Sequence, residues 1–371
     1  MKVAIVHFDI SLRTGAQRLI LGLGKTLRDL GNEVVYFTAI YDKNTAFDEF
    51  SEYNIISSNG KTNTFNKFKA MTAYFESKQM MKAGTKKFNP DLFFFSSNYY
   101  LAAKYKPSII YCHHPEALLL KDKNIVRKLL HYPIDRMEKD GFRKTNAIIS
   151  NSNYTKTAVR TLFKRESEIA YPGVDIKQFE YSSKADDYVL TVNRIMPSKN
   201  IELAIEAIQF LKDSKNIRIK LIIAGTSQPG YEWYVEDLKR KIKNSGLEQQ
   251  IELNLDVKDN KLRDLYHNCK LFIYTPVAEH FGIAPIEAMS CGKPVIAINS
   301  AGPSETVINE KTGFLIDNLP DECGKKIEEL YYNTEKLNSM GINARKRVED
   351  NFSWGAFSNS IEKTISKTKL H

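Results

Sequence analysis

The sequence predicts an α/β protein of two Rossmann-like domains, each with a doubly wound parallel sheet, that face each other across a cleft. The chain has 371 residues, which at roughly 150 residues per domain corresponds to two domains. Short apolar runs alternate with segments of helical period in both halves, as expected for parallel strands joined by helices. The polar segment Asp175–Asp187 shows neither an apolar run nor a helical period, so we expect the domain boundary there.

The first half begins with a strand and a helix and continues with further strands. Lys2–Phe8 is a short apolar run typical of a buried parallel strand. Ala16–Leu30 has leucines along one helical face, and Gly31 followed by Asn32 ends that helix. The later strands of this half are expected at Glu33–Thr38, Leu92–Ser96, Ser108–Cys112 and Ala147–Ser150.

The second half repeats this alternation. Asn200–Leu211 carries isoleucine and alanine on one helical face. Pro285–Ser290 is expected to be a helix that ends before Pro294, because proline cannot continue a helix. Further helices are expected at Trp233–Asn244 and Asn260–Cys269, and strands at Tyr188–Val192, Arg218–Ala224, Ile251–Leu255, Leu271–Tyr274 and Pro294–Ile298.

Composition restricts the class of protein. Hydrophobic residues make up 42% and charged residues 26%, which excludes disorder, collagen and coiled coil as descriptions of the whole chain. The four cysteines are scattered without a C-x-x-C pair, as in core thiols of a reducing compartment. No apolar run has the length of a signal-peptide core or a membrane span. We therefore expect a cytoplasmic protein.

The excess of positive charge lies entirely in the first half. Residues 1–180 contain 28 Lys and Arg against 18 Asp and Glu, whereas residues 181–371 contain 26 of each kind. This asymmetry suggests an anionic partner, such as nucleic acid, a membrane surface or a phosphorylated substrate. The alternative is a basic surface that only keeps the protein soluble. Lys61–Phe88 combines lysines with aromatic and methionine residues at helical spacing. It is either a basic amphipathic helix at an anionic membrane or a core helix with solvated lysines.

Common nucleotide-site patterns are missing or misplaced. Gly24-Lys25-Thr26 has the letters that end a P-loop, but it falls inside a predicted helix, which favours close helix–sheet packing. No G-x-G-x-x-G follows the first strand, which disfavours a dinucleotide-dependent dehydrogenase. No two aspartates are spaced as D-x-D, so the usual acidic clamp for a metal–diphosphate is missing. We therefore expect neither a metal nor a cofactor.

The strongest constellation of polar residues surrounds two glutamates. Glu279 lies in the loop after the predicted strand Leu271–Tyr274, and Glu287 follows eight residues later on the next helix. Phe281 and Gly282 precede this helix, whose N-terminal N–H groups form a natural anion site. A carboxylate can accept hydrogen bonds from sugar hydroxyls, and its two oxygens can take both hydroxyls of a ribose. The alternative is a solvated loop followed by a capping carboxylate.

This segment resembles the E-x7-E signature of the retaining, GT-B-fold glycosyltransferases of family 4. Other motifs of that family follow in matching order over nearly the whole chain, with Thr14 and Ala301 each replacing one glycine. These motifs are Thr14-Gly15-Ala16-Gln17-Arg18 (G-G-x-x-R), Tyr171-Pro172-Gly173-Val174-Asp175 (P-x-G-V-D), Arg194 with Lys199 and Asn200 (R-x4-K-N) and Ala301-Gly302-Pro303-Ser304-Glu305-Thr306 (G-G-P-x-E-T). Cys112-His113-His114-Pro115-Glu116 resembles the Y-C-H-x-P segment of the mannosyltransferases that extend lipid-linked oligosaccharides.

The resemblance implies a role for each matched residue. Arg194 and Lys199 would neutralise the departing diphosphate, together with the backbone N–H of Gly15. Glu279 and His113 would hold the donor sugar, and Glu287 would bind the ribose. The implied catalytic residues are His113, Glu279, Arg194 and Lys199, and the implied donor-binding residues are Gly15, Arg194, Lys199, Phe281, Gly282, Ile283 and Glu287. Acceptor-binding residues stay unassigned.

The resemblance also implies an organisation and a reaction. Residues 1–175 would form the acceptor-side domain and residues 176–352 the nucleotide-sugar domain, with residues 353–371 as a helix that crosses back to the first domain. The enzyme would transfer a hexose, which is expected to be mannose. The expected donor is GDP-mannose, and a UDP-sugar is the alternative donor. Transfer would retain the anomeric configuration and use a lipid-linked or polysaccharide acceptor. The protein would be cytoplasmic, with peripheral contact to the cytoplasmic membrane face as an option.

Two other classes of function stay open. A nonhydrolysing UDP-sugar epimerase shares the GT-B architecture, but the E-x7-E and R-x4-K-N patterns disfavour it. A non-enzymatic basic protein that binds membrane or nucleic acid would explain the charge. It would not explain Glu279, Glu287, Arg194 and Lys199 in this order, and no nucleic-acid-binding motif is present.

Overall fold

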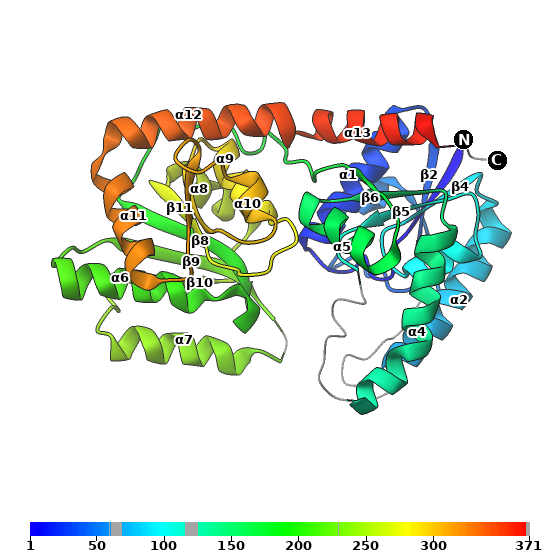
Figure 1. Ribbon diagram of the computed structural model, residues 1–371, viewed down its shortest axis with the longest axis horizontal. Coiled ribbons are helices and arrows are strands. Elements are labelled where there is room, and N and C mark those ends of the chain that lie inside the picture. Colours follow the sequence, from blue (N-terminus) through cyan, green and yellow to red (C-terminus); the bar gives the residue numbers. More distant parts are fainter. Residues whose placement is uncertain (59, 61–68, 116–124, 229, 369–371) are drawn as a thin grey trace. The chain divides into compact units, whose positions relative to one another are not determined.

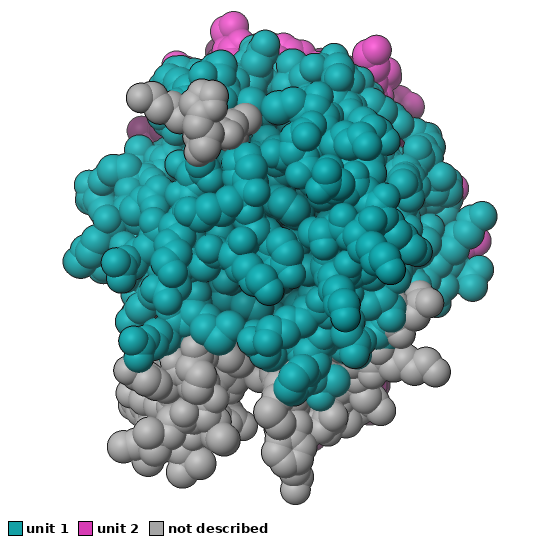
Figure 2. All heavy atoms as spheres, turned by 90° about the vertical axis from the view of Figure 1, so that its right-hand side faces the viewer, with its two compact units in different colours: residues 1–173, 354–371 teal, residues 174–353 magenta. Residues whose placement is uncertain are grey.

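The computed structural model describes residues 1–58, 60, 69–115, 125–228 and 230–368 (Figure 1). The chain divides into two compact units, residues 1–173 with 354–371, and residues 174–353 (teal and magenta in Figure 2). The predicted boundaries after residues 175 and 352 lie within two residues of this division. Each unit is built on one parallel sheet, so the predicted class of two Rossmann-like α/β domains is confirmed. The cleft expected between them stays a prediction.

Unit 1 contains a seven-stranded parallel sheet in the order β3-β2-β1-β4-β5-β6-β7. Its strands are β1 (Lys2–Val6), β2 (Glu33–Thr38), β3 (Asn54–Ser57), β4 (Leu92–Phe95), β5 (Ser108–Cys112), β6 (Ala147–Ser150) and β7 (Glu168–Ile169). The edge strands β3 and β7 were missed by the sequence analysis. They are only four and two residues long and partly exposed, so they lack the apolar run of a central strand.

The two faces of this sheet are covered by different helices. Alternate residues of β1 point to opposite faces, so Val3 and Ile5 join one apolar core whereas Ala4 and Val6 join another. The first core lies under α1 and α13, and the second includes methionines of α2. The helices of unit 1 are α1 (Gly15–Asp29), η1 (Asp48–Glu52), α2 (Lys69–Phe88), η2 (Tyr99–Ala103), α4 (Ile125–Lys144), α5 (Asn153–Phe163) and α13 (Trp354–Lys367).

The triplet Gly24-Lys25-Thr26 lies inside α1, which excludes the P-loop conformation. A Cβ atom on Gly24 would lie 1.9 Å from the hydroxyl oxygen of Tyr36 on β2. Only a glycine lets the helix approach the sheet this closely. The predicted helix–sheet packing of this triplet is therefore what the structure shows.

The C-terminal helix α13 belongs to unit 1 although it is last in sequence. It lies beside α1, and its residues Phe357 and Ile361 are buried in the core that α1 covers (Figure 1). The ring of Trp354 packs against Gly22, where a Cβ atom would approach within 2.0 Å of that ring. Burial of each such apolar side chain contributes roughly 1.5–3 kcal/mol. The helix expected at residues 353–371 is thus a structural part of the first unit.

Unit 2 contains a six-stranded parallel sheet in the order β10-β9-β8-β11-β12-β13. Its strands are β8 (Tyr188–Ile195), β9 (Lys220–Ser227), β10 (Ile251–Leu255), β11 (Leu271–Tyr274), β12 (Val295–Ile298) and β13 (Gly313–Ile316). Its helices are η3 (Pro197–Lys199), α6 (Ile201–Lys215), α7 (Glu232–Asn244), α8 (Asp259–Asn268), α9 (Ile283–Ser290), α10 (Pro303–Thr306), α11 (Pro320–Tyr332) and α12 (Thr334–Asn351). Edge strand β13 was not predicted from the sequence.

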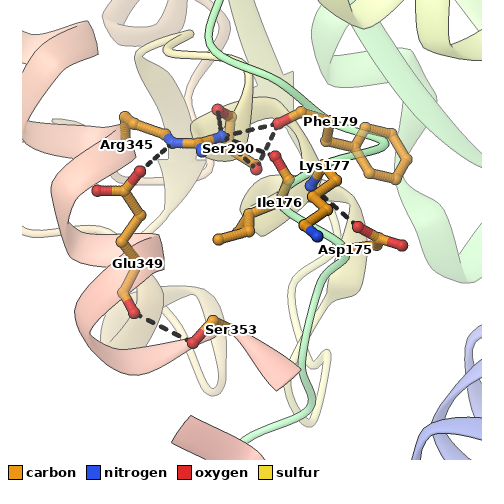
Figure 3. A network of polar contacts seen from close by, with 8 residues as sticks. All are labelled: Asp175, Ile176, Lys177, Phe179, Ser290, Arg345, Glu349 and Ser353. Carbon is orange, nitrogen blue, oxygen red and sulfur yellow. Dashed lines mark hydrogen bonds and ion pairs between the residues drawn. The ribbon is translucent and has the colours of Figure 1, made fainter. Parts of the chain in front are cut away.

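The segment that opens unit 2 is fixed to α12 by one arginine (Figure 3). The Arg345 guanidinium donates to the carbonyl oxygens of Phe179 at 2.9 Å and of Ser290 at 2.8 Å. It also pairs with Glu349 at 2.6 Å one helical turn along α12. Because this planar group offers five N–H donors, it can hold carbonyls from two chain segments at once. The segment predicted to be a polar linker is therefore attached to unit 2.

Candidate active site

The predicted donor-site residues of unit 2 lie at the carboxyl ends of two neighbouring strands. Arg194 lies near the end of β8, and Lys199 ends the short helix η3 that follows. Glu279 lies in the loop between β11 and α9, and Glu287 lies on α9. Because β8 and β11 are parallel neighbours, their carboxyl ends meet at the same edge of the sheet. Residues that are distant in sequence therefore converge there.

Lys199 and Glu279 form a direct ion pair at this edge. Their side chains are only 11% and 25% exposed, so the attraction is screened less than at an open surface. The Tyr274 hydroxyl also donates to Glu279 Oε2 at 3.3 Å. Burial by itself would raise the pKa of Glu279, but Lys199, Arg194 and Tyr274 together hold this pKa below its ordinary value. Glu279 is therefore a carboxylate at neutral pH.

Asn200 fixes the loop that carries Lys199. Asn200 adopts the left-handed conformation with φ of 50°, and its Nδ2 donates to the Thr275 carbonyl at 3.1 Å. The Thr275 hydroxyl donates in turn to the Lys199 carbonyl at 2.8 Å. Asn200 belongs to the R-x4-K-N motif, but the sequence indicated no role for it. Its role here is to hold the η3 turn against the end of β11.

The start of α9 is shaped by close backbone packing. Gly282 has φ of 85°, and a Cβ atom there would lie 3.0 Å from the Tyr274 ring, so glycine is needed for both reasons. Phe281 is buried, and Ile283 is the first residue of α9. The N–H of Gly302 donates to the Glu279 carbonyl at 2.8 Å. The turn at residues 301–306, identified from its motif, thus supports the loop that carries Glu279.

Glu287 is held by a tyrosine that the sequence analysis missed. The Tyr266 hydroxyl on α8 donates to Glu287 Oε2 at 2.9 Å. Tyr266 is fully buried, and this burial together with the charge of Glu287 raises its pKa well above the usual range. The hydroxyl therefore stays protonated and orients the carboxylate. No motif marked Tyr266, because a tyrosine within a helix carries no spacing signal.

Two of the predicted residues lie in unit 1. His113 follows directly after β5, and Gly15 is the exposed first residue of α1. The Nε2 atom of His113 lies 2.7 Å from Ser96 Oγ, and its backbone N–H donates to the Tyr99 hydroxyl at 3.1 Å. The N-terminus of this fifteen-residue helix has the polarity that binds anions. The imidazole of His113 is thus oriented by its own unit.

The residues of unit 2 form an arrangement suited to a sugar nucleotide. A buried cation, an exposed arginine, two carboxylates and a helix N-terminus are present at one sheet edge. The cations can take phosphate charge, and carboxylates can accept hydrogen bonds from sugar and ribose hydroxyls. Arg194 acts on Glu279 and Tyr274 through its charge. Neither the pairing of Lys199 with Glu279 nor the contact of Tyr274 was predicted from the sequence.

Two family models match the chain. Residues 13–178 match Glycosyltransferase Family 4, and residues 175–347 match Glycosyl transferases group 1. The first match covers His113 and Gly15, and the second covers Arg194, Lys199 and the segment from Glu279 to Glu287. Every predicted site residue therefore lies within a matched range.

Curated relatives extend this similarity. The chain is 32% identical over 292 residues to alpha-1,3/1,6-mannosyltransferase ALG2 of Homo sapiens, which covers 72% of this chain and 69% of that protein. It is 29% identical over 421 residues to the protein of the same name from Dictyostelium discoideum, with 99% and 98% of the two chains covered. The similarity to the second relative thus spans both units.

Solved structures share the fold. Sucrose-phosphate synthase from Thermosynechococcus elongatus has a TM-score of 0.84 at 19% identity, covering 99% of this chain and 98% of that chain. Anabaena HepE in complex with UDP-glucose has a TM-score of 0.78 at 19% identity, covering 99% of each chain. At these identities the likeness establishes the two-domain architecture alone.

Proposed function

Because the chain belongs to the family 4 glycosyltransferases, we propose that it transfers mannose from a sugar nucleotide to a lipid-linked oligosaccharide. The relatives that support this substrate class are named alpha-1,3/1,6-mannosyltransferases. We propose GDP-mannose as the donor and retention as the stereochemical course. A polysaccharide acceptor is the alternative that the sequence left open.

The observation that carries this proposal is the partly buried Lys199–Glu279 ion pair at the edge where β8 and β11 end. As the glycosidic bond to the diphosphate breaks, negative charge develops on the leaving oxygen and positive charge on the anomeric carbon. Lys199 and Arg194 are proposed to stabilise the first charge. The Glu279 carboxylate is proposed to accept hydrogen bonds from the sugar hydroxyls. We assign no covalent nucleophile.

The remaining site residues are proposed to bind parts of the donor. The Glu287 carboxylate, oriented by Tyr266, would accept hydrogen bonds from both ribose hydroxyls. The segment 281–283 at the start of α9 would bring backbone N–H groups to the diphosphate. The roles of Gly15 at the diphosphate and of His113 at the donor sugar stay predictions drawn from the family resemblance.

The direct test of this function is incubation with radiolabelled GDP-mannose, UDP-glucose and ADP-glucose, with a mannosylated lipid-linked oligosaccharide as acceptor. Transfer from GDP-mannose with an α-linked product is the expected result. Isomerisation of a UDP-sugar without an acceptor would instead favour an epimerase. If the protein neither transfers, hydrolyses nor isomerises any of these sugar nucleotides, a non-enzymatic basic protein is favoured.

We expect Glu287→Gln to weaken binding of free GDP by about 10-fold to 100-fold, because hydrogen bonds to a charged group contribute about 1.5–3 kcal/mol. Isothermal titration calorimetry measures this affinity directly. Tyr266→Phe should weaken binding less, because it only releases the orientation of the carboxylate. The ribose assignment is wrong if Glu287→Gln binds GDP as tightly as the unaltered protein.

Turnover is expected to survive EDTA, because the diphosphate charge is assigned to Arg194 and Lys199 and the sequence has no D-x-D. The measurement is initial rate after exhaustive chelation, with a D-x-D-containing glycosyltransferase as the chelation control. Loss of activity that Mn²⁺ or Mg²⁺ restores would contradict metal-independent catalysis.

A basic surface on α2 is proposed to contact anionic membrane. In the described part of the chain, Lys78, Lys82, Lys86 and Lys87 are exposed on this helix, and Phe75 is 56% exposed. Other apolar residues of the helix, including Met80 and Met81, are buried in the core, as expected for a core helix with solvated lysines. The parts of the predicted amphipathic segment at Lys61, Phe65, Lys67 and Phe68 lie outside the described residues. Within the described residues, no helix is both long and apolar enough to cross a bilayer.

Co-sedimentation with vesicles tests this surface. Binding to vesicles with anionic lipid is expected to fall with added salt, because each lysine near the surface contributes about 1 kcal/mol through a screened attraction. Replacement of Lys78, Lys82 and Lys86 by glutamine should reduce binding, whereas the same change at the exposed Lys239, Lys243 and Lys346 of unit 2 should not. Equal binding to neutral and anionic vesicles would contradict the electrostatic contact.

A further inference from the structure

Three polar residues directly follow three neighbouring strands of unit 1. His7 follows β1, Ser96 follows β4 and His113 follows β5, and these strands are adjacent in the order β1-β4-β5. The Nδ1 atom of His7 lies 3.2 Å from Ser96 Oγ, and the same Oγ lies 2.7 Å from Nε2 of His113. His7 is 8% exposed and Ser96 is 1% exposed. One buried hydroxyl thus links two imidazoles.

The other side of His7 faces Gln17 on α1. Gln17 Nε2 lies 2.8 Å from the carbonyl oxygen of Asp9 and 3.5 Å from His7 Nε2. The Thr14 hydroxyl donates to Gln17 Oε1. A carbonyl oxygen only accepts hydrogen bonds, so the atom of Gln17 that faces Asp9 must be the NH₂ group. That group also faces His7, so His7 Nε2 is an acceptor.

An imidazole that accepts at Nε2 carries its proton at Nδ1 when it is neutral. Burial lowers the pKa of His7 to about 4, which keeps the ring neutral near pH 7, although a hydrogen bond to the Ser96 backbone opposes this effect. A hydrogen bond to the Ser96 backbone that favours the protonated His7 ring must be donated by the ring to a carbonyl oxygen. This agrees with a proton on Nδ1 of His7. His7 therefore donates toward Ser96. The Ser96 hydroxyl has one proton, and it can donate this proton to Nε2 of His113, which lies 2.7 Å away.

We propose that Gln17, His7 and Ser96 form a directional hydrogen-bond chain that fixes His113 as the neutral tautomer with its proton on Nδ1. These three residues are positioning residues, because they act on His113. A ring fixed in this way meets its next partner as a donor through Nδ1, and a sugar hydroxyl can accept that hydrogen bond. Only this catalytic consequence rests on the proposed role of His113 at the donor sugar. The tautomer itself is inferred from the contacts within unit 1 alone.

The tautomer can be read from the ¹⁵N shifts of the histidine side chains in the full-length protein. The chain has seven histidines, and the spectrum of His113→Gln identifies the signals of His113. The expected result is a protonated Nδ1 and an unprotonated Nε2, which is the less common form of a free histidine in water. Protonation at Nε2 in the unaltered protein would overturn the proposal.

Variants of Ser96 test the chain link by link. Ser96→Ala removes the donor to Nε2, so His113 should shift toward the Nε2–H form, while Ser96→Thr keeps a hydroxyl and should keep Nδ1–H. The control is Ser97→Ala, since the neighbouring Ser97 hydroxyl accepts from the Phe8 backbone N–H at 2.8 Å and lies outside the chain. Thermal melts confirm that each variant is folded. An unchanged His113 tautomer in folded Ser96→Ala would overturn the proposal.

Turnover separates this inference from the proposed function. Ser96→Ala should lower kcat about 10-fold, as for the loss of one hydrogen bond, and Ser96→Thr should restore it. If the tautomer follows the prediction but His113→Ala keeps normal turnover, the role of His113 at the sugar fails while the chain stands. If His113→Ala is inactive but Ser96→Ala changes neither the tautomer nor kcat, the chain fails while the role of His113 stands.

Discussion

Replacement of Lys199 by methionine is expected to lower kcat by about 10²-fold to 10³-fold, the loss typical when one preorganised donor to a developing anion is removed. Methionine keeps most of the apolar stem of the side chain and removes the ammonium group. The reason for the large effect is burial, since the Lys199 side chain is only 11% exposed and acts with little solvent screening. Arg194→Met is expected to lower kcat in the same direction. Steady-state transfer from GDP-mannose measures both.

A second ion-paired lysine of unit 2 provides the control for this experiment. Lys241 forms an ion pair with Glu206 at 2.6 Å, between α7 and α6 of the same unit, and it has no part in the proposed site. Lys241→Met should therefore keep kcat near that of the unaltered protein. The assignment of the leaving-group charge is wrong if Lys199→Met and Arg194→Met both turn over at the normal rate.

The second large effect is expected for Glu279→Ala. This change removes the carboxylate proposed to hold the sugar, and we expect kcat to fall about 10²-fold, because hydrogen bonds to a charged group contribute about 1.5–3 kcal/mol. It also leaves the Lys199 ammonium buried without its partner, which in general costs about 3 kcal/mol or more of stability. Urea unfolding measures the stability, and the two losses can be separated with the double variant Glu279→Ala with Lys199→Met. If the ion pair explains the stability loss, the double variant is more stable than Glu279→Ala.

The pH dependence of stability provides an independent check on Glu279. The pKa of its carboxyl is lower in the folded protein than its ordinary value of 4.5. The carboxylate therefore contributes stability above pH 4.5, and this contribution is lost as the pH falls below that value toward the folded pKa. The free energy of unfolding of Glu279→Gln should therefore fall less than that of the unaltered protein as the pH is lowered below 4.5. An identical acid profile for the two proteins would contradict the lowered pKa.

Elements with a local signal could be predicted from the amino-acid sequence. Apolar runs between helical periods placed β2, β5 and β6 at their observed bounds, because a central parallel strand is buried on both faces and must be apolar throughout. The motif around Glu279 and Glu287 placed both glutamates correctly on the β11 loop and on α9. The matched motifs also predicted the family of the chain. Each motif places a few side chains at fixed spacing after a particular strand, and this spacing can be recognised in the sequence.

Which of these residues contact one another depends on how the strands are ordered in each sheet. Lys199 and Glu279 are 80 positions apart, and His7 and Ser96 are 89 positions apart. No local period encodes such a pair, because strand order in the sheet brings the loops together. The same limit applies to Tyr266 at Glu287, and to the short edge strands, which pair by backbone hydrogen bonds with little apolar side-chain signal. The chain thus encodes its strands and helices locally, whereas the ion pairs and hydrogen bonds of the site arise from the order in which the strands pack.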